Sequence, residues 1–167
     1  MTDRPDNIKI RFTLEEDAPL LKRWLSDPQI LRWFPMCDER EIDDAVRIWV
    51  SYSKIQACLT ALWDGVPCGM ANLYIQSFKK LSHTCLLSII VDERFRGKGV
   101  GKALLEELAI LAKEKFHIEI LHLEVYEGNP ARRLYERMGF IYYGIHKRFI
   151  KERGEYLSKV FMQKELP

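Results

Sequence analysis

Residues 91–102 constrain the fold of this chain more than any other segment. They read Val-Asp-Glu-Arg-Phe-Arg-Gly-Lys-Gly-Val-Gly-Lys and begin where a strand-like apolar run, residues 81–91, ends. Apolar residues then recur at helical spacing, which predicts a helix that continues to about Phe116. These residues are Val100, Leu104, Leu108 and Leu111. A strand therefore enters a helix through a glycine-rich turn, because glycine permits backbone conformations that other residues avoid.

The start of that helix is a predicted anion site. The backbone N–H groups of a first helical turn have no partner within the helix, and the helix dipole places partial positive charge there. Glycines let a ligand approach this backbone closely, and Arg96 and Lys102 add two full positive charges. The segment therefore predicts a ligand that carries phosphate. The alternative is structural, because the same glycines could merely shape a tight turn.

Two common phosphate-binding motifs do not match this segment. A Walker A loop that ends at Gly101-Lys102 requires glycine at position 96 and Ser or Thr at position 103, which are arginine and alanine here. A dinucleotide-binding loop that begins at Gly97 and Gly99 requires glycine at position 102, which is lysine. A protein that uses this loop to bind ATP is therefore the weaker alternative.

The remaining segments predict one domain that spans residues 1–167 and belongs to the α+β, or mixed α/β, class. Alternation of apolar residues predicts strands, and helical spacing with capping residues predicts helices. Strands are expected at residues 8–12, 55–63, 66–76, 81–91, 118–125, 140–149 and 155–163, with turns at Asp64-Gly65 and Arg153-Gly154. Helices are expected at residues 14–25, 39–52, 100–116 and 130–139, with caps at Thr13-Glu16, Asp38-Glu41 and Asn129-Pro130. The predicted order is β-α-α-β-β-β-α-β-α-β-β.

Composition and charge exclude several classes of protein. The formal net charge is +2, and basic and acidic residues are intermixed, unlike the basic face of a nucleic-acid-binding protein. The four cysteines form no CxxC pair and stand beside no histidine cluster, so no metal site is expected. No apolar run reaches the roughly 18 residues that a membrane span needs, and no secretory signal is visible. We therefore expect a cytoplasmic protein without nucleic-acid or membrane partners.

Residues 123–140 form a second informative segment, Leu-Glu-Val-Tyr-Glu-Gly-Asn-Pro-Ala-Arg-Arg-Leu-Tyr-Glu-Arg-Met-Gly-Phe. Residues 96–101 resemble the pyrophosphate loop of the GNAT family of N-acetyltransferases, written (Arg/Gln)-x-x-Gly-x-(Gly/Ala). Residues 123–140 resemble the second cofactor segment of that family, with its Asn, its Tyr and a closing Gly-Phe. The resemblance extends over nearly the whole chain. It implies the GNAT fold, a single domain with a central mixed, mostly antiparallel sheet flanked by helices.

The resemblance implies acetyl-CoA as co-substrate and assigns roles to individual residues. Backbone groups of the strand that ends at Val91 would pair with the pantetheine arm, and the amides of residues 97–102 would hold the pyrophosphate. Asn129 would bond the pantetheine portion, and Tyr135 would protonate the departing thiolate as the catalytic residue. The implied cofactor-binding residues are Ile89, Ile90, Val91, Arg96, Gly97, Lys98, Gly99, Val100, Gly101, Lys102, Asn129 and Tyr135.

Several of these residues also have a purely structural explanation. Asn129 would cap a helix, Tyr135 would pack in the core and Gly139 would end a helix. The two segments together favour the cofactor site. In that site, the resemblance implies that the strands around residues 89–91 and 123–125 splay apart and leave a V-shaped slot.

The general base is not assigned by the sequence. A primary amine has a pKa near ~10 in water, so a group must accept its proton before it attacks a thioester. Many members of the family place a glutamate on the strand before the pyrophosphate loop, but residues 85–91 contain no carboxylate here. His83, His122 and Glu124 are the candidates.

The resemblance places the acceptor site in a lobe formed by the first two helices and the final hairpin, residues 24–36 and 149–162. Trp33 and Phe34 are the candidate substrate-binding residues, because aromatic rings can frame an amine, and core packing is their alternative. Residues 149–162 are similar to the branch that contains spermidine and ribosomal-protein N-terminal acetyltransferases. Ser158 departs from that branch, which often has an acidic residue at this position.

The sequence thus predicts an acetyl-CoA-dependent N-acetyltransferase. It would transfer an acetyl group to a primary amine, on a small molecule, a polyamine or a peptide N-terminus, by direct attack in a ternary complex. The alternative is a non-catalytic module of the same fold that binds or senses acyl-CoA. The acceptor amine, the acyl-chain preference and the presence of a homodimer are left open.

Overall fold

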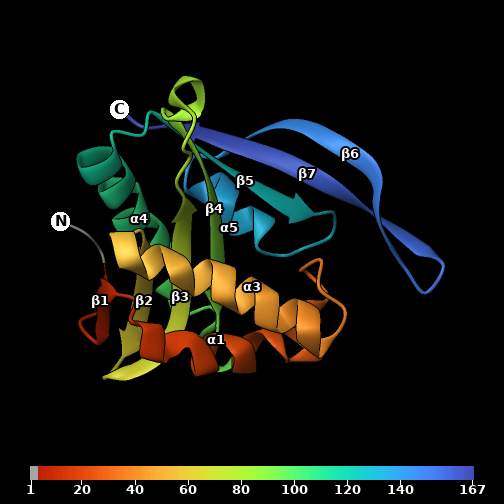
Figure 1. Cartoon of the computed structure of the whole chain (residues 1–167), viewed down its shortest axis with the longest axis horizontal. Coiled ribbons are helices and arrows are strands. Elements are labelled where there is room, and N and C mark those ends of the chain that lie inside the picture. The colour runs from red at the N-terminus through yellow and green to blue at the C-terminus, as the bar shows by residue number, and fades with distance from the viewer. Residues whose placement is uncertain (1–3) are drawn as a thin grey trace.

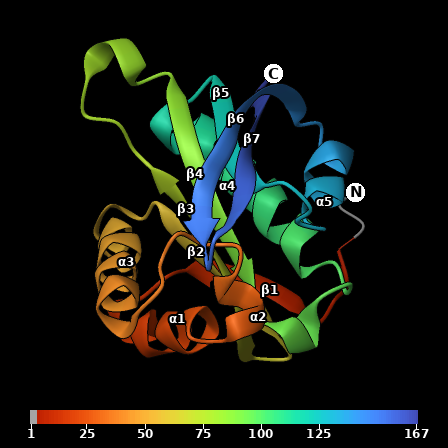
Figure 2. The same ribbon diagram turned by 90° about the vertical axis from the view of Figure 1, so that its right-hand side faces the viewer.

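The computed structural model describes residues 4–167, which build one seven-stranded sheet with helices on both faces (Figures 1 and 2). The strand order is β1-β2-β3-β4-β5-β7-β6, and every neighbouring pair is antiparallel except β4 and β5, which are parallel. The strands are β1 (Ile8–Phe12), β2 (Cys58–Trp63), β3 (Val66–Tyr74), β4 (Thr84–Val91), β5 (Ile120–Tyr126), β6 (Ile141–Glu152) and β7 (Glu155–Glu165). This architecture confirms the predicted mixed α/β class with a mostly antiparallel sheet.

The helices are α1 (Ala18–Leu25), α2 (Pro28–Leu31), α3 (Glu39–Ser51), α4 (Val100–Phe116) and α5 (Arg132–Arg137). Short 3-10 turns lie at Glu15–Asp17, Tyr52–Ile55, Lys79–Leu81 and Glu93–Phe95. Helix α2 was not predicted. It forms because the side chain of Asp27 accepts a hydrogen bond from the N–H of Gln29 and Pro28 suits a first helical turn.

The predicted helix cap at Thr13 is wrong. The Thr13 hydroxyl lies 2.8 Å from the hydroxyl of Thr60 in β2 and caps no helix. The carboxylate of Asp17 instead accepts a hydrogen bond from the N–H of Leu14 at 2.9 Å and forms an ion pair with Arg11 at 2.7 Å. The chain therefore makes a 3-10 turn first, and α1 begins only at Ala18, although it ends at Leu25 as expected.

Two hydrophobic cores cover the two faces of the sheet. Alternation along β3 sends Met70 to the core beneath α1 and α3, and Ala71 and Leu73 to the core beneath α4 and α5. Figure 2 shows these two helical layers on opposite sides of the strands. In the described part of the chain, residues 4–167, no helix is long and apolar enough to span a membrane.

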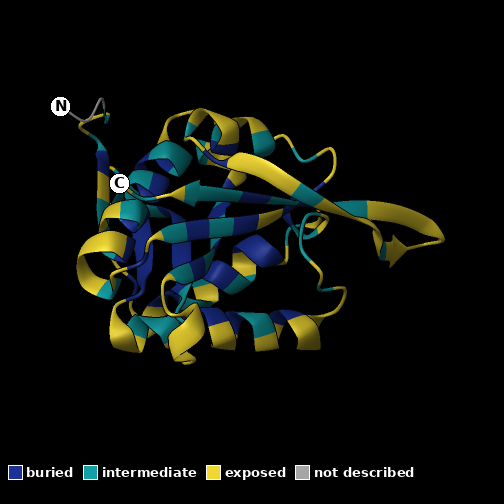
Figure 3. Ribbon diagram, turned by 90° about the horizontal axis from the view of Figure 1, so that it is seen from above, coloured by how far each residue is buried: buried dark blue, intermediate teal, exposed yellow. Residues whose placement is uncertain are grey.

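The β6–β7 hairpin extends beyond the rest of the molecule, and much of β6 is exposed (Figures 1 and 3). It turns at Arg153-Gly154, as predicted, but β6 continues to Glu152 rather than ending at residue 149. The pairing shifts register between His146 and Ile150, where Arg148 adopts a positive φ of 57°. A bulge of this kind bends a strand and adds twist, which lets the long hairpin curve.

Candidate active site between the splayed strands

The parallel pair of β4 and β5 stays hydrogen-bonded over a short stretch only. The paired residues run from Thr84 opposite Ile120 to Leu86 opposite His122. Beyond Leu86, β4 continues for five residues and β5 for four without a pairing between them. The two strands therefore separate toward their carboxyl ends, as expected for a V-shaped slot.

A cavity of about 1000 Å³ occupies this slot. Its wall includes most of the residues for which the sequence predicts a role in binding or catalysis. They are Ile89, Ile90, Val91, Arg96, Gly97, Gly99, Val100, Gly101, Lys102, Asn129, Tyr135, Trp33 and Phe34. Lys98 does not line the cavity, and its ammonium group lies 5.3 Å from the ring centre of Trp63. The fold thus gathers segments that are far apart in the sequence around one space.

The glycine loop presents the start of α4 to this cavity. Gly97 and Gly99 have φ angles of 71° and 86°, a left-handed conformation that strongly favours glycine. Gly99 caps α4, and the first helical bond runs from the N–H of Ala103 to its carbonyl. The three preceding N–H groups have no acceptor within the helix, and no acidic residue lies in this first turn. With Arg96 beside it, this end of the cavity suits a pyrophosphate.

The two predicted cofactor segments touch each other at Gly101. A Cβ atom at this position would lie 2.8 Å from Cδ2 of Leu134 in α5, so a larger residue would require the Leu134 side chain to move. At the start of α5, the side-chain oxygen of Asn129 accepts a hydrogen bond from the N–H of Ala131 at 2.9 Å. The predicted helix cap at Asn129 is therefore wrong: the N-cap of α5 is Ala131, and Asn129 stabilises the turn before the helix and lines the cavity.

Tyr135 packs in the core and also borders the cavity. It is 8% exposed, belongs to the core beneath α4 and packs edge-to-face against Phe140 with 6.2 Å between ring centres. Its hydroxyl makes no hydrogen bond to another residue in the described part of the chain. Burial raises the pKa of Tyr135 to about 12. The side chain is therefore a protonated hydrogen-bond donor throughout the neutral pH range.

Part of the cavity wall is apolar. The candidate residues Trp33 and Phe34 belong to this wall, together with residues that the sequence did not single out. The further wall residues include Ile30, Met36, Ile48, Trp49, Tyr74 and Ser88. Ser88 of β4 donates a hydrogen bond to the hydroxyl of Tyr74 at 3.1 Å. Only the tertiary structure reveals that these residues line the cavity, since their local sequence resembles that of ordinary core residues.

Of the three candidate bases, Glu124 alone lines the cavity. Continuing the register beyond Leu86 and His122 places Glu124 opposite Ser88 across the open slot, on the face toward α3. The carboxylate of Glu124 forms an ion pair with Lys159 of β7 at 2.7 Å, and Lys159 also lies over the ring of Phe149 at 3.6 Å. The hairpin therefore fixes this carboxylate, which sequence spacing alone does not indicate.

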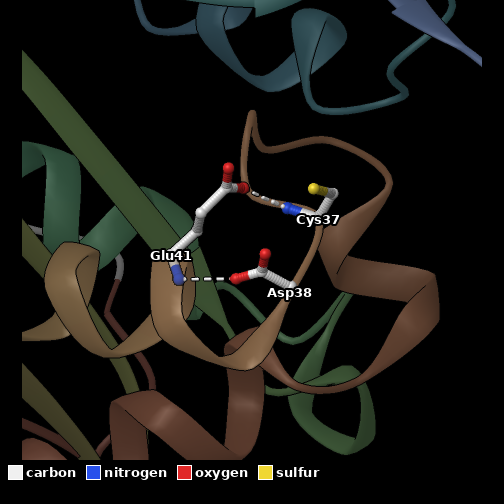
Figure 4. A group of neighbouring side chains, drawn as sticks. All are labelled: Cys37, Asp38 and Glu41. Atoms are coloured by element: carbon white, nitrogen blue, oxygen red, sulfur yellow. Dashed lines mark hydrogen bonds between the residues drawn. The ribbon is translucent and has the colours of Figure 1, made fainter.

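Cys37, Asp38 and Glu41 form a compact group at the start of α3 (Figure 4). Asp38 accepts a hydrogen bond from the N–H of Glu41 at 2.9 Å, as the predicted capping pair requires. The Glu41 carboxylate accepts a hydrogen bond from the N–H of Cys37 at 2.7 Å, one residue before the expected partner. Helix capping explains the position of both carboxylates, so this exposed group is part of the helix start.

Comparisons with known proteins agree with this geometry. A family model described as "Acetyltransferase (GNAT) family" matches residues 19–140. The chain belongs to the GNAT acetyltransferase family. A solved structure from Salmonella typhimurium, yncA, a putative acetyltransferase with its cofactor acetyl-CoA, shares the fold of this GNAT chain at a TM-score of 0.81. It is 22% identical, over 97% of this chain and 95% of the other.

Three curated relatives of this GNAT chain are N-acetyltransferases. L-amino acid N-acetyltransferase AaaT of Escherichia coli is 30% identical over 62% of this chain. The ribosomal protein bS18-alanine N-acetyltransferase of Haemophilus influenzae is 41% identical over 41%, and the spermine/spermidine N(1)-acetyltransferase of Bacillus subtilis is 40% identical over 32%. The matches span 65%, 47% and 36% of the relatives' own lengths, which is less than two thirds in each case.

Proposed function

We propose that this GNAT chain is an acetyl-CoA-dependent N-acetyltransferase that acetylates a primary amine by direct attack in a ternary complex. The observation that carries the proposal is the cavity between β4 and β5. Its wall combines the anion-binding start of α4, the buried donor Tyr135 and a group of apolar side chains. The named relatives act on amino acids, a protein alanine and polyamines, which are all amines.

The proposed reaction needs three contributions from the chain. Glu124 accepts the proton of the amine, directly or through water, so that the nitrogen lone pair attacks the thioester carbon. A backbone N–H near Val91 on the unpaired part of β4 stabilises the negative charge that develops on the carbonyl oxygen. The carbon–sulfur bond then breaks, and the Tyr135 hydroxyl donates a hydrogen bond to the departing sulfur.

Tyr135 is a better hydrogen-bond donor than a full proton donor in this scheme. Its pKa of about 12 lies above the pKa of a thiol, ~8.5. Complete transfer of its proton to a free thiolate would therefore be uphill by roughly 5 kcal/mol. The nitrogen of the tetrahedral adduct carries a positive charge, so its own proton is the more acidic one and passes to the departing sulfur, which leaves as CoA thiol. The first proton, held by Glu124, is released to bulk water, which reaches this partly exposed carboxylate.

The non-catalytic alternative requires the same cofactor site but no acceptor chemistry. The presence of Glu124 and Tyr135 in the wall of one cavity supports the enzyme instead. We further propose the cytoplasm as its location, since the described cysteines Cys37, Cys58, Cys68 and Cys85 are all unpaired.

Acetyl-CoA is expected to stabilise the fold, whereas ATP is not. The glycine loop lacks the Walker residues, and the slot beside it suits an extended arm rather than a nucleotide alone. A ligand at 100 times its dissociation constant adds about 2.7 kcal/mol, which raises the melting temperature of a chain of this size by roughly 5–11 °C. Differential scanning fluorimetry with acetyl-CoA, CoA, ATP and NAD measures the shift. An unchanged melting temperature at saturating acetyl-CoA would contradict the proposed function.

Glu124→Gln is expected to lower kcat/KM for the amine by about 100-fold, the lower end of the range for a general base. Bulk water reaches this partly exposed carboxylate and can replace it in part. The affinity for acetyl-CoA should stay within about twofold of the wild-type value, measured by calorimetry. His122→Gln is the control, because His122 shares β5 but does not line the cavity. Equal losses in both variants would remove Glu124 from the mechanism.

Replacement of Trp33 and Phe34 by alanine is expected to raise the KM for the amine about tenfold or more, with little change in the KM for acetyl-CoA. Both side chains line the cavity and come from a segment outside the two predicted cofactor segments, so we expect their removal to delete apolar contacts to the acceptor. Steady-state kinetics with each substrate varied in turn gives both constants. A larger rise in the KM for acetyl-CoA would show that the acceptor site has been misassigned.

A further inference from the structure

The charges on the cavity wall are unevenly distributed. Among its lining residues in the described chain, the only acidic residue is Glu124, whereas four are basic. The basic residues are Arg96, Lys102, Arg137 and Lys159. The single carboxylate already has a cationic partner, because Lys159 holds it at 2.7 Å and is itself only 13% exposed. The wall therefore offers no unpaired carboxylate to a second positive charge on an acceptor.

A polyamine needs such carboxylates. It carries more than one ammonium group at neutral pH, and each additional one must lose part of its hydration on entering the cavity. The carboxylates of Asp38 and Glu41 lie outside the lining, and both are engaged with backbone N–H groups at the start of α3 (Figure 4). An amine with one charge, neutralised when it gives its proton to Glu124, avoids this cost.

The candidate aromatic residue Trp33 in the cavity wall is also poorly placed to bind a cation. The guanidinium group of Arg32 lies 4.6 Å from the ring centre of Trp33, so one face of the indole already contacts a positive charge. Phe34, Met36 and Ile48, which line the same cavity, are apolar. Ile48 on α3 is 46% exposed, so this part of the wall presents apolar surface to the cavity. Such a surface gains free energy by covering an apolar substituent.

We infer that the acceptor is a primary amine with one positive charge and a large apolar substituent, which lies between residues 33–36 and α3, and that polyamines are rejected. This inference rests on the proposed function and specifies its substrate class. The amine itself lies near Glu124 and Ser88, and the substituent extends toward Ile48 and Trp33. A free amino acid and the N-terminal residue of a peptide both fit this description.

The test measures release of CoA thiol by the full chain with acetyl-CoA and three amines of similar basicity. They are 2-phenylethylamine, ethylamine and spermidine. We expect kcat/KM for 2-phenylethylamine to exceed that for ethylamine and for spermidine by at least about tenfold. L-phenylalanine and L-phenylalanylglycine, assayed in parallel, distinguish a free amino acid from a peptide N-terminus as the source of the group.

A matched pair of variants tests whether the preference for an apolar amine over spermidine depends on this cavity wall. Ile48→Asp introduces a carboxylate in the apolar part of the wall, and Ile110→Asp makes the same change at an equally exposed isoleucine, 47%, on α4 outside the cavity. We expect Ile48→Asp to lower kcat/KM for 2-phenylethylamine about tenfold and to raise it for spermidine, with the KM for acetyl-CoA unchanged. Ile110→Asp should match the wild type in all three.

The outcomes separate this inference from the proposed function. Acetylation of spermidine at a rate equal to or above that of 2-phenylethylamine would overturn the inference and leave the enzyme assignment intact. Equal behaviour of Ile48→Asp and Ile110→Asp would also overturn it. Binding of acetyl-CoA without acetylation of any amine would overturn the proposed function, and the inference with it.

Discussion

Tyr135→Phe is expected to lower turnover by about 10²–10³-fold, the range for loss of one hydrogen-bond donor to a developing negative charge, while acetyl-CoA affinity stays within about twofold of the wild type. The substitution removes one oxygen and leaves the ring, so the edge-to-face packing against Phe140 should survive. The loss arises because the variant lacks the hydroxyl that we propose donates a hydrogen bond to the departing sulfur. Turnover at saturating acetyl-CoA and amine, beside calorimetric affinity, measures the effect.

Single-turnover kinetics must accompany this measurement, because product release rather than chemistry can limit turnover. Tyr52→Phe is the control, since Tyr52 is a half-buried tyrosine outside the cavity that contacts both cores.

The pH profile of turnover gives an independent check. Because the pKa of Tyr135 is about 12, its donor form persists below that value and is lost only above it. Wild-type kcat should therefore show no fall due to Tyr135 below about pH 11, and turnover of the variant near the wild-type rate would exclude this role.

Gly99→Val is expected to weaken acetyl-CoA binding by about 100-fold or more. The φ angle of Gly99 is 86°, so a β-branched residue strains the loop and displaces the N–H groups at the start of α4. Each hydrogen bond to a charged phosphate contributes about 1.5–3 kcal/mol, and two lost bonds suffice for this effect. Isothermal calorimetry with CoA measures the affinity.

Gly65→Val separates the loss of the phosphate site from general strain. Gly65 has nearly the same φ angle, 83°, in the β2–β3 turn, and a Cβ there meets no atom within 4 Å. Both variants should lose some stability in thermal melts, but only Gly99→Val should lose affinity for CoA. Wild-type affinity in a folded Gly99→Val protein would mean that the loop does not bind the pyrophosphate.

Local sequence predicted most of the elements because their signals act over a few residues. The helix cap at Asp38 and the turns at Asp64-Gly65 and Arg153-Gly154 form as expected, since each depends on neighbouring backbone groups. Thr13 is by its local sequence an equally suitable helix N-cap, yet its hydroxyl contacts Thr60, 47 residues away. A distant partner that happens to lie close in the sheet overrides a local preference.

The sequence by itself determined the family, through the resemblance of two motifs, and the order of the seven strands and of four of the five helices, because apolar periodicity records backbone requirements directly. It also predicted the glycine-rich turn before α4. The tertiary structure decided three further features: the separation of β4 and β5 beyond Leu86, the ion pair of Glu124 with Lys159, and the apolar wall around Ile48. Each depends on side chains from segments far apart in the chain. Their distances follow from how the sheet twists and how α3 and the hairpin pack, which no local pattern specifies.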